Sequence, residues 1–174
     1  MEGAGSWRVS PLFRTGLIAA VAALVLDQAS KLWLLNVFEL GPRGTVRITP
    51  FFDLVLAWNT GISYGWFQDT GPLGQALLLG FKGLAIIVLG IWMARSGTRL
   101  AVIGLGLIIG GAIGNAIDRL AYGAVVDFAL FHIEIGGKTY NWYVFNLADV
   151  AIVAGVAALL YDSFVTPDAA KRPR

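Results

Sequence analysis

The residues of this chain that could do chemistry are carboxylates, amides and a few cations near the ends of apolar segments. In chain order they are Asp27, Lys31, Asn115, Asp118, Arg119, Asp127, Asn146 and Asp149. Two carboxylates held close together at low dielectric cannot both ionise easily, so one keeps its proton. The ionised carboxylate can take a proton from water while the protonated one donates to a substrate oxygen or leaving amine. These residue types therefore allow hydrolysis without a metal.

Other kinds of site are disfavoured by what the sequence lacks. The chain has no cysteine and a single histidine, His132, which argues against thiol catalysis, Cys- or His-rich metal sites and a Ser-His-Asp triad. Ser30 beside Lys31 could suggest a Ser-Lys dyad, but neighbouring helix positions point about 100° apart. We therefore expect no metal and no cofactor. With a net charge of +2 and no basic run interleaved with aromatics, we also expect no nucleic-acid partner.

The segments that carry these residues are predicted to cross a membrane. Hydrophobic residues make up 57% of the 174 residues and charged residues 14%, whereas soluble domains carry about 25% charged residues. A bilayer core requires about 20 apolar residues per helix. One domain with four spans follows, at about 13–35, 72–93, 100–121 and 144–165.

The first span has a second interpretation, because Arg14 followed by the apolar run 15–26 resembles a cleaved signal peptide. The apolar pattern resumes at 32–35, however, and no small-x-small cleavage site follows the run. We therefore interpret the segment as an uncleaved helix.

The orientation of the spans follows from the basic residues in the short loops. Seven fall on one side: Arg8, Arg14, Arg95, Arg99, Lys171, Arg172 and Arg174. Only Arg43, Arg47 and Lys138 fall on the other. The positive-inside rule places both termini in the cytoplasm. The extracytoplasmic segments are then about 36–71 and 122–143.

The two extracytoplasmic segments are predicted to contain structure of their own. Residues 46–49 and 53–58 show partial strand-like alternation, and 133–135 with 139–143 indicate a hairpin closed by Gly136-Gly137. Both segments are rich in aromatic residues, which favour the membrane–water interface. The predicted fold is an all-α membrane protein of four transmembrane helices with a small extracytoplasmic β element and a short interfacial helix on the outer leaflet.

This topology brings the polar residues to one depth. Spans one and three run outward, so Asp27 and Lys31 lie in an outer half, and Asn115, Asp118 and Arg119 lie near an outer end. Span four runs inward from Asn146 and Asp149. Lys82, midway along span two, does not fit this set. Polar groups within a membrane are costly and usually serve a function.

Each motif also has a purely structural interpretation. Asp27 with Lys31, and Asp118 with Arg119, could be ion pairs that lock helices together. Asn146 with Asp149 could be a helix cap with its capping-box partner. Glycines 106, 110 and 114 have the small-xxx-small spacing of close helix contacts. No single motif decides between structure and function.

Two other classes of membrane protein, a small transporter and a non-enzymatic scaffold, are alternatives to a hydrolase. A small four-span proton-coupled transporter needs polar groups spread across the bilayer, yet the inner halves of spans one, three and four are nearly free of charge. A non-enzymatic scaffold leaves the convergence of acids from several segments unexplained.

At this point five sequence blocks reveal a family resemblance. They are Asp27-Gln28-x-x-Lys31, Asn59-Thr60-Gly61, Gly110-Gly111-Ala112-Ile113-Gly114-Asn115-Ala116-Ile117-Asp118-Arg119, Val125-Val126-Asp127-Phe128 and Phe145-Asn146-x-Ala148-Asp149. Their order over about 120 residues, together with the span pattern, resembles bacterial lipoprotein signal peptidase, or signal peptidase II.

The resemblance implies an inner-membrane aspartyl peptidase that cuts prolipoproteins just before a diacylglyceryl-modified cysteine, with membrane lipids as further partners. It maps the catalytic pair onto Asp127 and Asp149. Its supporting or substrate-binding residues map onto Asp27, Lys31, Asn59, Gly61, Asn115, Asp118, Arg119 and Asn146. Two departures from the family pattern are Ile62-Ser63-Tyr64-Gly65 and a slightly long stretch between the two acids.

The residues themselves leave a choice of dyad, because Asp118 also lies at the shared depth. Asp118 has Asn115 and Arg119 as ready partners, so we expect it to stay ionised. Asp127 follows Gly123 and lies among Val125, Val126 and Phe128, an apolar setting that should raise its pKa. Asp149 begins a helix, which favours a carboxylate. We therefore assign Asp149 as the base and Asp127 as the acid of a coupled pair.

Overall fold

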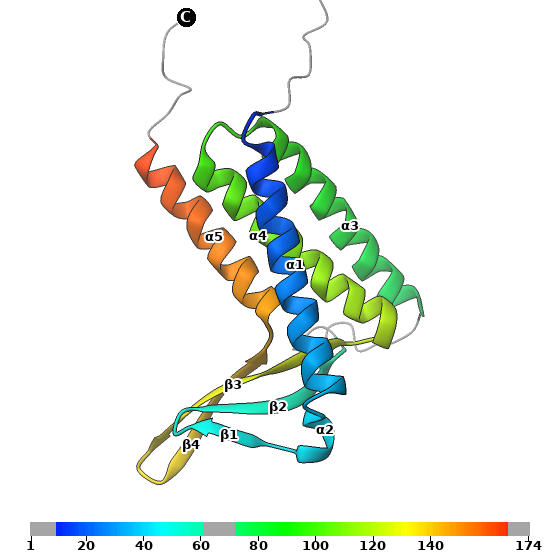
Figure 1. The fold of residues 1–174 in the computed structure, drawn as a ribbon, viewed down its shortest axis with the longest axis vertical. Coiled ribbons are helices and arrows are strands. Elements are labelled where there is room, and N and C mark those ends of the chain that lie inside the picture. Colours follow the sequence, from blue (N-terminus) through cyan, green and yellow to red (C-terminus); the bar gives the residue numbers. More distant parts are fainter. Residues whose placement is uncertain (1–9, 61–71, 167–174) are drawn as a thin grey trace, which may run out of the picture.

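The structure, a computed structural model, describes residues 10–60 and 72–166 and is mostly helical. Its helices are α1 (Phe13–Asn36), α2 (Leu40–Arg43), α3 (Pro72–Arg95), α4 (Arg99–Tyr122) and α5 (Leu147–Val165). Its strands are β1 (Val46–Thr49), β2 (Phe52–Asn59), β3 (Val125–Ile135) and β4 (Lys138–Phe145). The four long helices form a bundle, and the sheet lies at one end of it (Figure 1).

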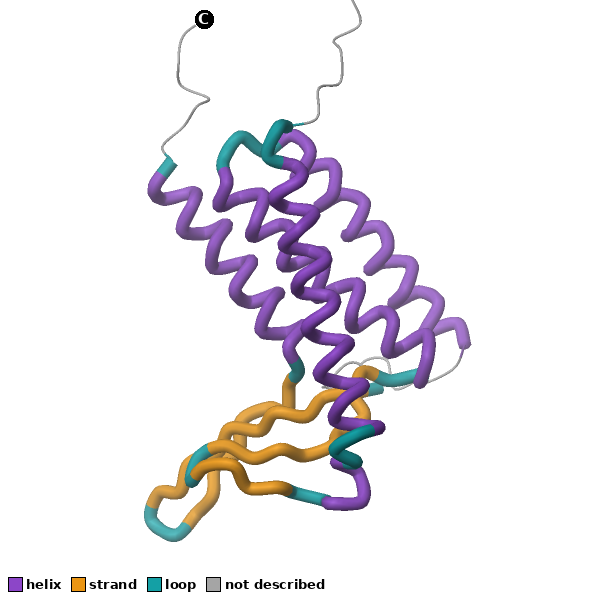
Figure 2. Tube along the Cα trace, viewed as in Figure 1, coloured by secondary structure: helices purple, strands orange, loops and turns teal. Residues whose placement is uncertain are grey.

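The start of α1, the end of α5 and the turn between α3 and α4 lie together at the end of the bundle opposite the sheet (Figures 1 and 2). The basic residues that flank that turn, Arg95 and Arg99, are therefore far from the sheet. These are the described segments that the sequence assigned to one side of the membrane.

Three helices in the described part of the chain are long and apolar enough to cross a membrane, namely α1, α4 and α5. Their outward side chains are apolar, with Ile18 70% and Phe164 81% exposed, as expected where lipid replaces water. Three of the four predicted spans are thus confirmed as candidates. The predicted span 72–93 falls in α3, whose described apolar part is the shorter stretch Gly83–Arg95.

Helix α4 is the centre of the bundle because its glycines let two neighbours approach closely. A Cβ at Gly110 would overlap the carbonyl oxygen of Ala20 on α1, and a Cβ at Gly111 would lie 2.5 Å from the carbonyl oxygen of Ala148 on α5. The predicted packing role of glycines 106, 110 and 114 is confirmed, since all three face α1. This packing places the ends of α1, α4 and α5 that are nearer the sheet next to one another.

The sheet is antiparallel throughout, with the strand order β1-β2-β3-β4. Gly136 and Gly137 both have positive φ, of 60° and 76°, as a two-residue hairpin turn requires. The predicted hairpin is therefore confirmed. Leu34 of α1, Leu40 of α2 and Phe128 of β3 form a small apolar core beneath the sheet, which fixes the sheet to the end of α1.

Two boundaries differ from the sequence expectation. Span four was expected to begin at 144, but β4 continues to Phe145 and α5 begins at Leu147 after the cap residue Asn146. The hairpin was expected to begin at 133, but its first strand, β3, begins at Val125 and carries Asp127. Gly123 ends α4 with φ 74°, and the strand begins two residues later.

Candidate active site

Four aspartates from four different elements meet where the helices join the sheet. They are Asp27 on α1, Asp118 on α4, Asp127 on β3 and Asp149 on α5. The first three are nearly inaccessible, at 0%, 1% and 2% exposure, and Asp149 is half-buried. Hydrogen bonds through Asn115 and Asn146 connect this cluster, so the predicted convergence of these residues is confirmed as a structural fact.

Asp127 is held by two side-chain amides. Its Oδ1 accepts a hydrogen bond of 2.7 Å from Asn146 Nδ2, and its Oδ2 accepts one of 3.0 Å from Asn59 Nδ2. Burial raises the pKa of Asp127 above its ordinary value, the amide of Asn59 opposes the rise, and the charge of Asp149 adds to it. The expected direction of this pKa shift therefore holds, and Asp127 can keep a proton to higher pH than an exposed carboxyl.

Asp149 is the third residue of α5 and closes a capping box with Asn146. The backbone N–H of Asp149 donates to Asn146 Oδ1 at 3.0 Å, and the backbone N–H of Asn146 donates to Asp149 Oδ2 at 3.2 Å. Asn115 Nδ2 donates to the other oxygen, Oδ1, at 3.0 Å. The interpretation of Asn146 and Asp149 as a capping box is thus correct. The same contacts place Asp149 beside Asn146, which is also a hydrogen-bond donor to Asp127.

Asn146 and Asn115 connect the whole cluster. Asn146 Nδ2 donates to Asn115 Oδ1 at 3.0 Å as well as to Asp127. Asn115 Oδ1 also accepts from Lys31 Nζ at 3.2 Å. Two amides therefore lie between the acids nearest the sheet and the cation on α1.

Lys31 forms buried ion pairs with two carboxylates. Its Nζ lies 2.8 Å from Asp27 Oδ2 and 2.7 Å from Asp118 Oδ2, and all three side chains are at most 2% exposed. The expected pair of Asp27 with Lys31 is confirmed. The expected partners of Asp118 were Asn115 and Arg119, but its ion pair in the described chain is with Lys31. Asp118 and Arg119 are adjacent in α4, so their side chains point to different sides of the helix.

Arg119 lies half-buried in the last turn of α4. Its Nη1 donates to the carbonyl oxygen of Asn115 at 3.2 Å. Its Nε is buried and has no hydrogen-bond partner among the described residues. A guanidinium near carboxylates can hold a substrate carbonyl or a developing negative charge.

One expected site residue lies outside the described residues, and one residue of the cluster was not predicted. Gly61 and the stretch 62–65 lie outside the described residues. Gln28, which lies in the first of the five sequence blocks, was not predicted as a site residue. Its Nε2 donates to Asp118 Oδ1 at 2.9 Å and to Asp27 Oδ2 at 3.2 Å. Its position beside Asp27 was the available signal.

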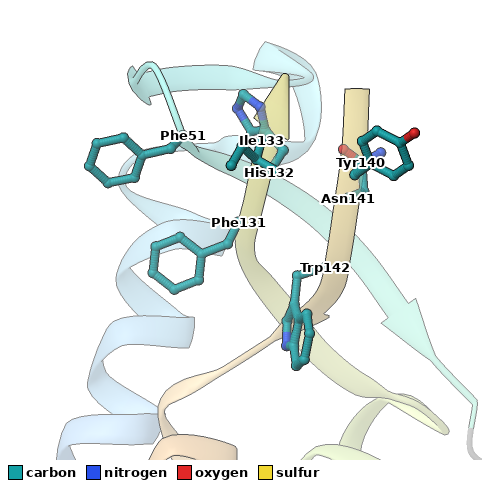
Figure 3. A pocket seen from close by; sticks show the side chains of 7 residues that line it. All are labelled: Phe51, Phe131, His132, Ile133, Tyr140, Asn141 and Trp142. Atoms are coloured by element: carbon teal, nitrogen blue, oxygen red, sulfur yellow. The ribbon is translucent and has the colours of Figure 1, made fainter. Parts of the chain in front are cut away.

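His132 takes no part in the carboxylate cluster. It lies farther along β3, where its Nε2 is 3.2 Å from Asp53 Oδ2, and both residues are buried. An open pocket of about 340 Å³ adjoins it on the hairpin (Figure 3). The pocket is lined by Phe51, Phe131, His132, Ile133, Tyr140, Asn141 and Trp142. In the described residues, no group of three or more His, Asp or Glu side chains is placed to hold a metal ion.

Comparison with known proteins gives consistent results. The family described as Signal peptidase (SPase) II matches residues 19–165. The chain is 73% identical over 165 residues to the lipoprotein signal peptidase of Nitrobacter hamburgensis, covering 95% of this chain and 100% of that one. It is also 73% identical over 160 residues to the lipoprotein signal peptidase of Rhodopseudomonas palustris strain CGA009, covering 92% and 98%.

Solved structures share the fold. A bacterial membrane enzyme determined by the in meso method at 1.9 Å resolution superposes with a TM-score of 0.69 at 24% identity, over 85% of this chain and 91% of that one. A second, at 2.3 Å resolution, gives a TM-score of 0.67 at 22% identity, over 92% and 93%.

Proposed function

The chain belongs to the signal peptidase II family of aspartic endopeptidases, which remove signal peptides from lipoproteins, and we propose that Asp127 and Asp149 are its catalytic pair. The observation that carries the assignment is Asn146, whose side chain bonds both to the carboxylate of Asp127 and to the backbone of Asp149. The alternative of a proton-coupled transporter has no support among these relatives.

The two acids suit different roles in attack by water. Asp127 has a pKa raised by burial, so it keeps its proton and serves as the general acid. Asp149 is half-buried at the start of α5 and serves as the base that takes a proton from water. The water oxygen then attacks the scissile carbonyl carbon, and the leaving amine receives a proton as the C–N bond breaks. Because the acids are coupled, proton positions belong to the pair.

The other polar residues orient the acids and hold the substrate. Asn59 and Asn146 fix the two oxygens of Asp127, and Asn115 fixes one oxygen of Asp149. Arg119, whose Nη1 donates to the carbonyl oxygen of Asn115, is proposed to hold the substrate carbonyl with its remaining guanidinium donors. Gly61, two residues after Asn59, is proposed to belong to the same substrate-binding segment.

The proposed substrate is a prolipoprotein whose cysteine carries diacylglyceryl, cut on the N-terminal side of that cysteine. Trp58 of β2 lies next to the site, since it is opposite Val126 of β3 in the sheet. The centroid of its ring is 5.5 Å from that of Tyr122. Trp58 and Tyr122 are both about half exposed, at 47% each. An exposed aromatic pair at the end of α4 offers apolar surface to acyl chains that arrive laterally from membrane lipid.

The bacterial family and the apolar helices support a location in the inner membrane. We propose that α3 is the fourth span, that both termini are cytoplasmic and that the acids lie near the outer face. The support is the charge asymmetry of the loops together with the position of the sheet at one end of the bundle (Figure 1). Asp127 lies in that sheet, and Asp149 lies at the start of α5 next to it.

The decisive experiment is cleavage of a lipidated precursor peptide by the purified protein in detergent. The expected result is release of the signal peptide by the wild type and none by Asp127→Asn or Asp149→Asn. Turnover by either variant at the wild-type rate would contradict the assignment.

A further inference from the structure

Each proposed catalytic acid is preceded in the chain by a residue whose backbone N–H donates to a buried carboxylate. Ala148, before Asp149, donates to Asp27 Oδ1 at 2.9 Å. Val126, before Asp127, donates to Asp118 Oδ2 at 3.1 Å. The backbone on both sides of the proposed site is thus anchored to side chains of other helices.

Lys31 connects these two anchors. Its Nζ pairs with Asp27 Oδ2 at 2.8 Å and with Asp118 Oδ2 at 2.7 Å. The chain of contacts therefore runs from the backbone before Asp149 through three buried side chains to the backbone before Asp127.

We propose that Asp27, Lys31 and Asp118 form a positioning triad that sets the separation of the two catalytic carboxylates. The inference rests on the proposed assignment of Asp127 and Asp149. None of the triad residues needs to touch the substrate. They act on the reaction through the backbone positions of Val126 and Ala148.

Packing around the triad fixes its geometry. A Cβ at Gly114 would lie 2.5 Å from Asp27 Oδ2, and its three nearest atoms would all belong to Asp27. The absence of a side chain there gives the carboxylate its place between α1 and α4. Gln28 adds donors to Asp27 and Asp118, at 3.2 and 2.9 Å, which helps to offset the excess negative charge of two carboxylates around one ammonium.

A merely stabilising role accounts poorly for this arrangement. Buried ion pairs often add little to stability compared with apolar residues of similar volume. A displacement of about 1 Å in an active site, in contrast, can lower turnover about 100-fold. Asp27 also accepts one of the first N–H groups of α5, which have no partner within the helix. It therefore fixes the end of the helix that carries Asp149.

The two carboxylates of the triad differ in a way that allows a sharp test. At Asp118, one oxygen, Oδ2, accepts from both Lys31 and Val126. At Asp27, the two contacts go to different oxygens, Oδ2 for Lys31 and Oδ1 for Ala148. Asparagine has a single acceptor oxygen. Asp118→Asn can therefore keep both contacts, whereas Asp27→Asn must lose one.

The experiment compares kcat and KM for the lipidated peptide in detergent, per mole of protein that binds an uncleavable lipidated peptide. We expect Asp27→Asn to lower kcat on the order of 100-fold and Asp118→Asn by less than about tenfold. Asp118→Ala, which has no acceptor for Val126, should fall to the level of Asp27→Asn. KM should stay near that of the wild type in all three, because the substrate-binding groups are unchanged.

A matched control is Asp53→Asn, since Asp53 is a buried aspartate of the sheet that pairs with His132 and Arg47. It undergoes the same chemical change away from the triad, and its kcat should equal that of the wild type even if its thermal midpoint falls. If Asp27→Asn does not fold, Gly114→Ala replaces it. The added methyl displaces the carboxylate of Asp27 without a change of charge and should also lower kcat alone.

Equal kcat values for Asp118→Asn and Asp118→Ala, or for Asp27→Asn and Asp118→Asn, would overturn the positioning triad. So would losses that appear in KM, or that match the loss in Asp53→Asn. These outcomes leave the catalytic assignment intact. That assignment fails only if Asp127→Asn or Asp149→Asn retains turnover.

Discussion

The side-chain amide of Asn146 lies 2.7 Å from the carboxylate of Asp127, so the cap residue of α5 is bonded directly to the third residue of β3. Its own oxygen accepts from the backbone N–H of Asp149 at 3.0 Å. One side chain thus both begins the helix and orients an acid on the neighbouring strand.

Replacement of Asn146 should separate these two tasks. Serine is a good helix cap but cannot bridge to Asp127, whereas alanine does neither. We expect Asn146→Ser and Asn146→Ala to lose turnover alike, and the alanine variant to be less stable by about 1 kcal/mol. Thermal unfolding in detergent and kcat per mole of folded protein measure the two effects. Wild-type turnover by Asn146→Ser would argue against an orienting role.

The pH dependence of turnover should move when Asn59 is changed. Burial raises the pKa of Asp127, and the Asn59 amide, which favours the ionised carboxylate, lowers it. Removal of that amide therefore raises the pKa further. Because turnover requires protonated Asp127, the activity of Asn59→Ala should persist to higher pH. The alkaline limb of its pH–rate profile should therefore lie at higher pH than that of the wild type.

The control for this shift is Asn36→Ala. Asn36 is an exposed residue at the end of α1 whose amide donates to Leu32 within the same helix. Its pH profile should coincide with that of the wild type. An alkaline limb at unchanged or lower pH in Asn59→Ala would assign the titrating acid elsewhere.

Much of the fold follows from patterns that the sequence displays directly. Apolar length predicts α1, α4 and α5, and two glycines predict the hairpin turn. The first half of β3 was not predicted as a strand, because Val125, Val126 and Phe128 are all buried although successive residues face opposite sides of the sheet. Such a strand gives a continuous apolar run without alternation, which periodicity cannot distinguish from a helix end.

The sequence predicted that the polar residues come together, but it did not predict which groups contact one another. Loop charges and span lengths bring Asp27, Asp118 and Asp149 to one level. They do not fix how each helix is rotated about its axis. The ion pair of Asp118 with Lys31, rather than with Arg119, therefore could not be predicted from the sequence. The backbone contacts of Ala148 and Val126 leave no trace in residue types at all.

The substrate's lipid should dominate recognition. Each buried methylene contributes about 0.8 kcal/mol, so two acyl chains far outweigh the peptide contacts. We expect the unmodified precursor to be cut much more slowly than its diacylglyceryl form by purified protein. Trp58→Ala should narrow that difference, because it removes exposed aromatic surface beside Asp127. Equal cleavage of both precursors by the wild type would refute recognition of the lipid.

The orientation of the chain can be tested with reporter fusions. In the sequence, seven basic residues fall in the terminal segments and in the turn at Arg95 and Arg99, and three fall in the other two loops. Fusions after Arg95 and at the C-terminus should therefore report the cytoplasm, and an insertion at Gly136 should report the outside. A cytoplasmic signal from Gly136 would place the sheet and the four aspartates on the inner side and would contradict the proposed topology.

The choice of dyad is tested by neutralising each acid near the sheet separately. Asp127 accepts from the side-chain amide of Asn146, and Asp149 accepts from the backbone N–H of the same residue. The carboxylate of Asp118 is instead bound by Lys31, Gln28 and the backbone N–H of Val126. A carboxylate that is permanently paired transfers protons poorly.

Asp127→Asn and Asp149→Asn should each abolish turnover and still bind an uncleavable lipidated peptide. Asp118→Asn should melt at lower temperature and retain turnover in the folded fraction. A well-folded but inactive Asp118→Asn, beside an active Asp127→Asn, would make Asp118 and Asp149 the dyad.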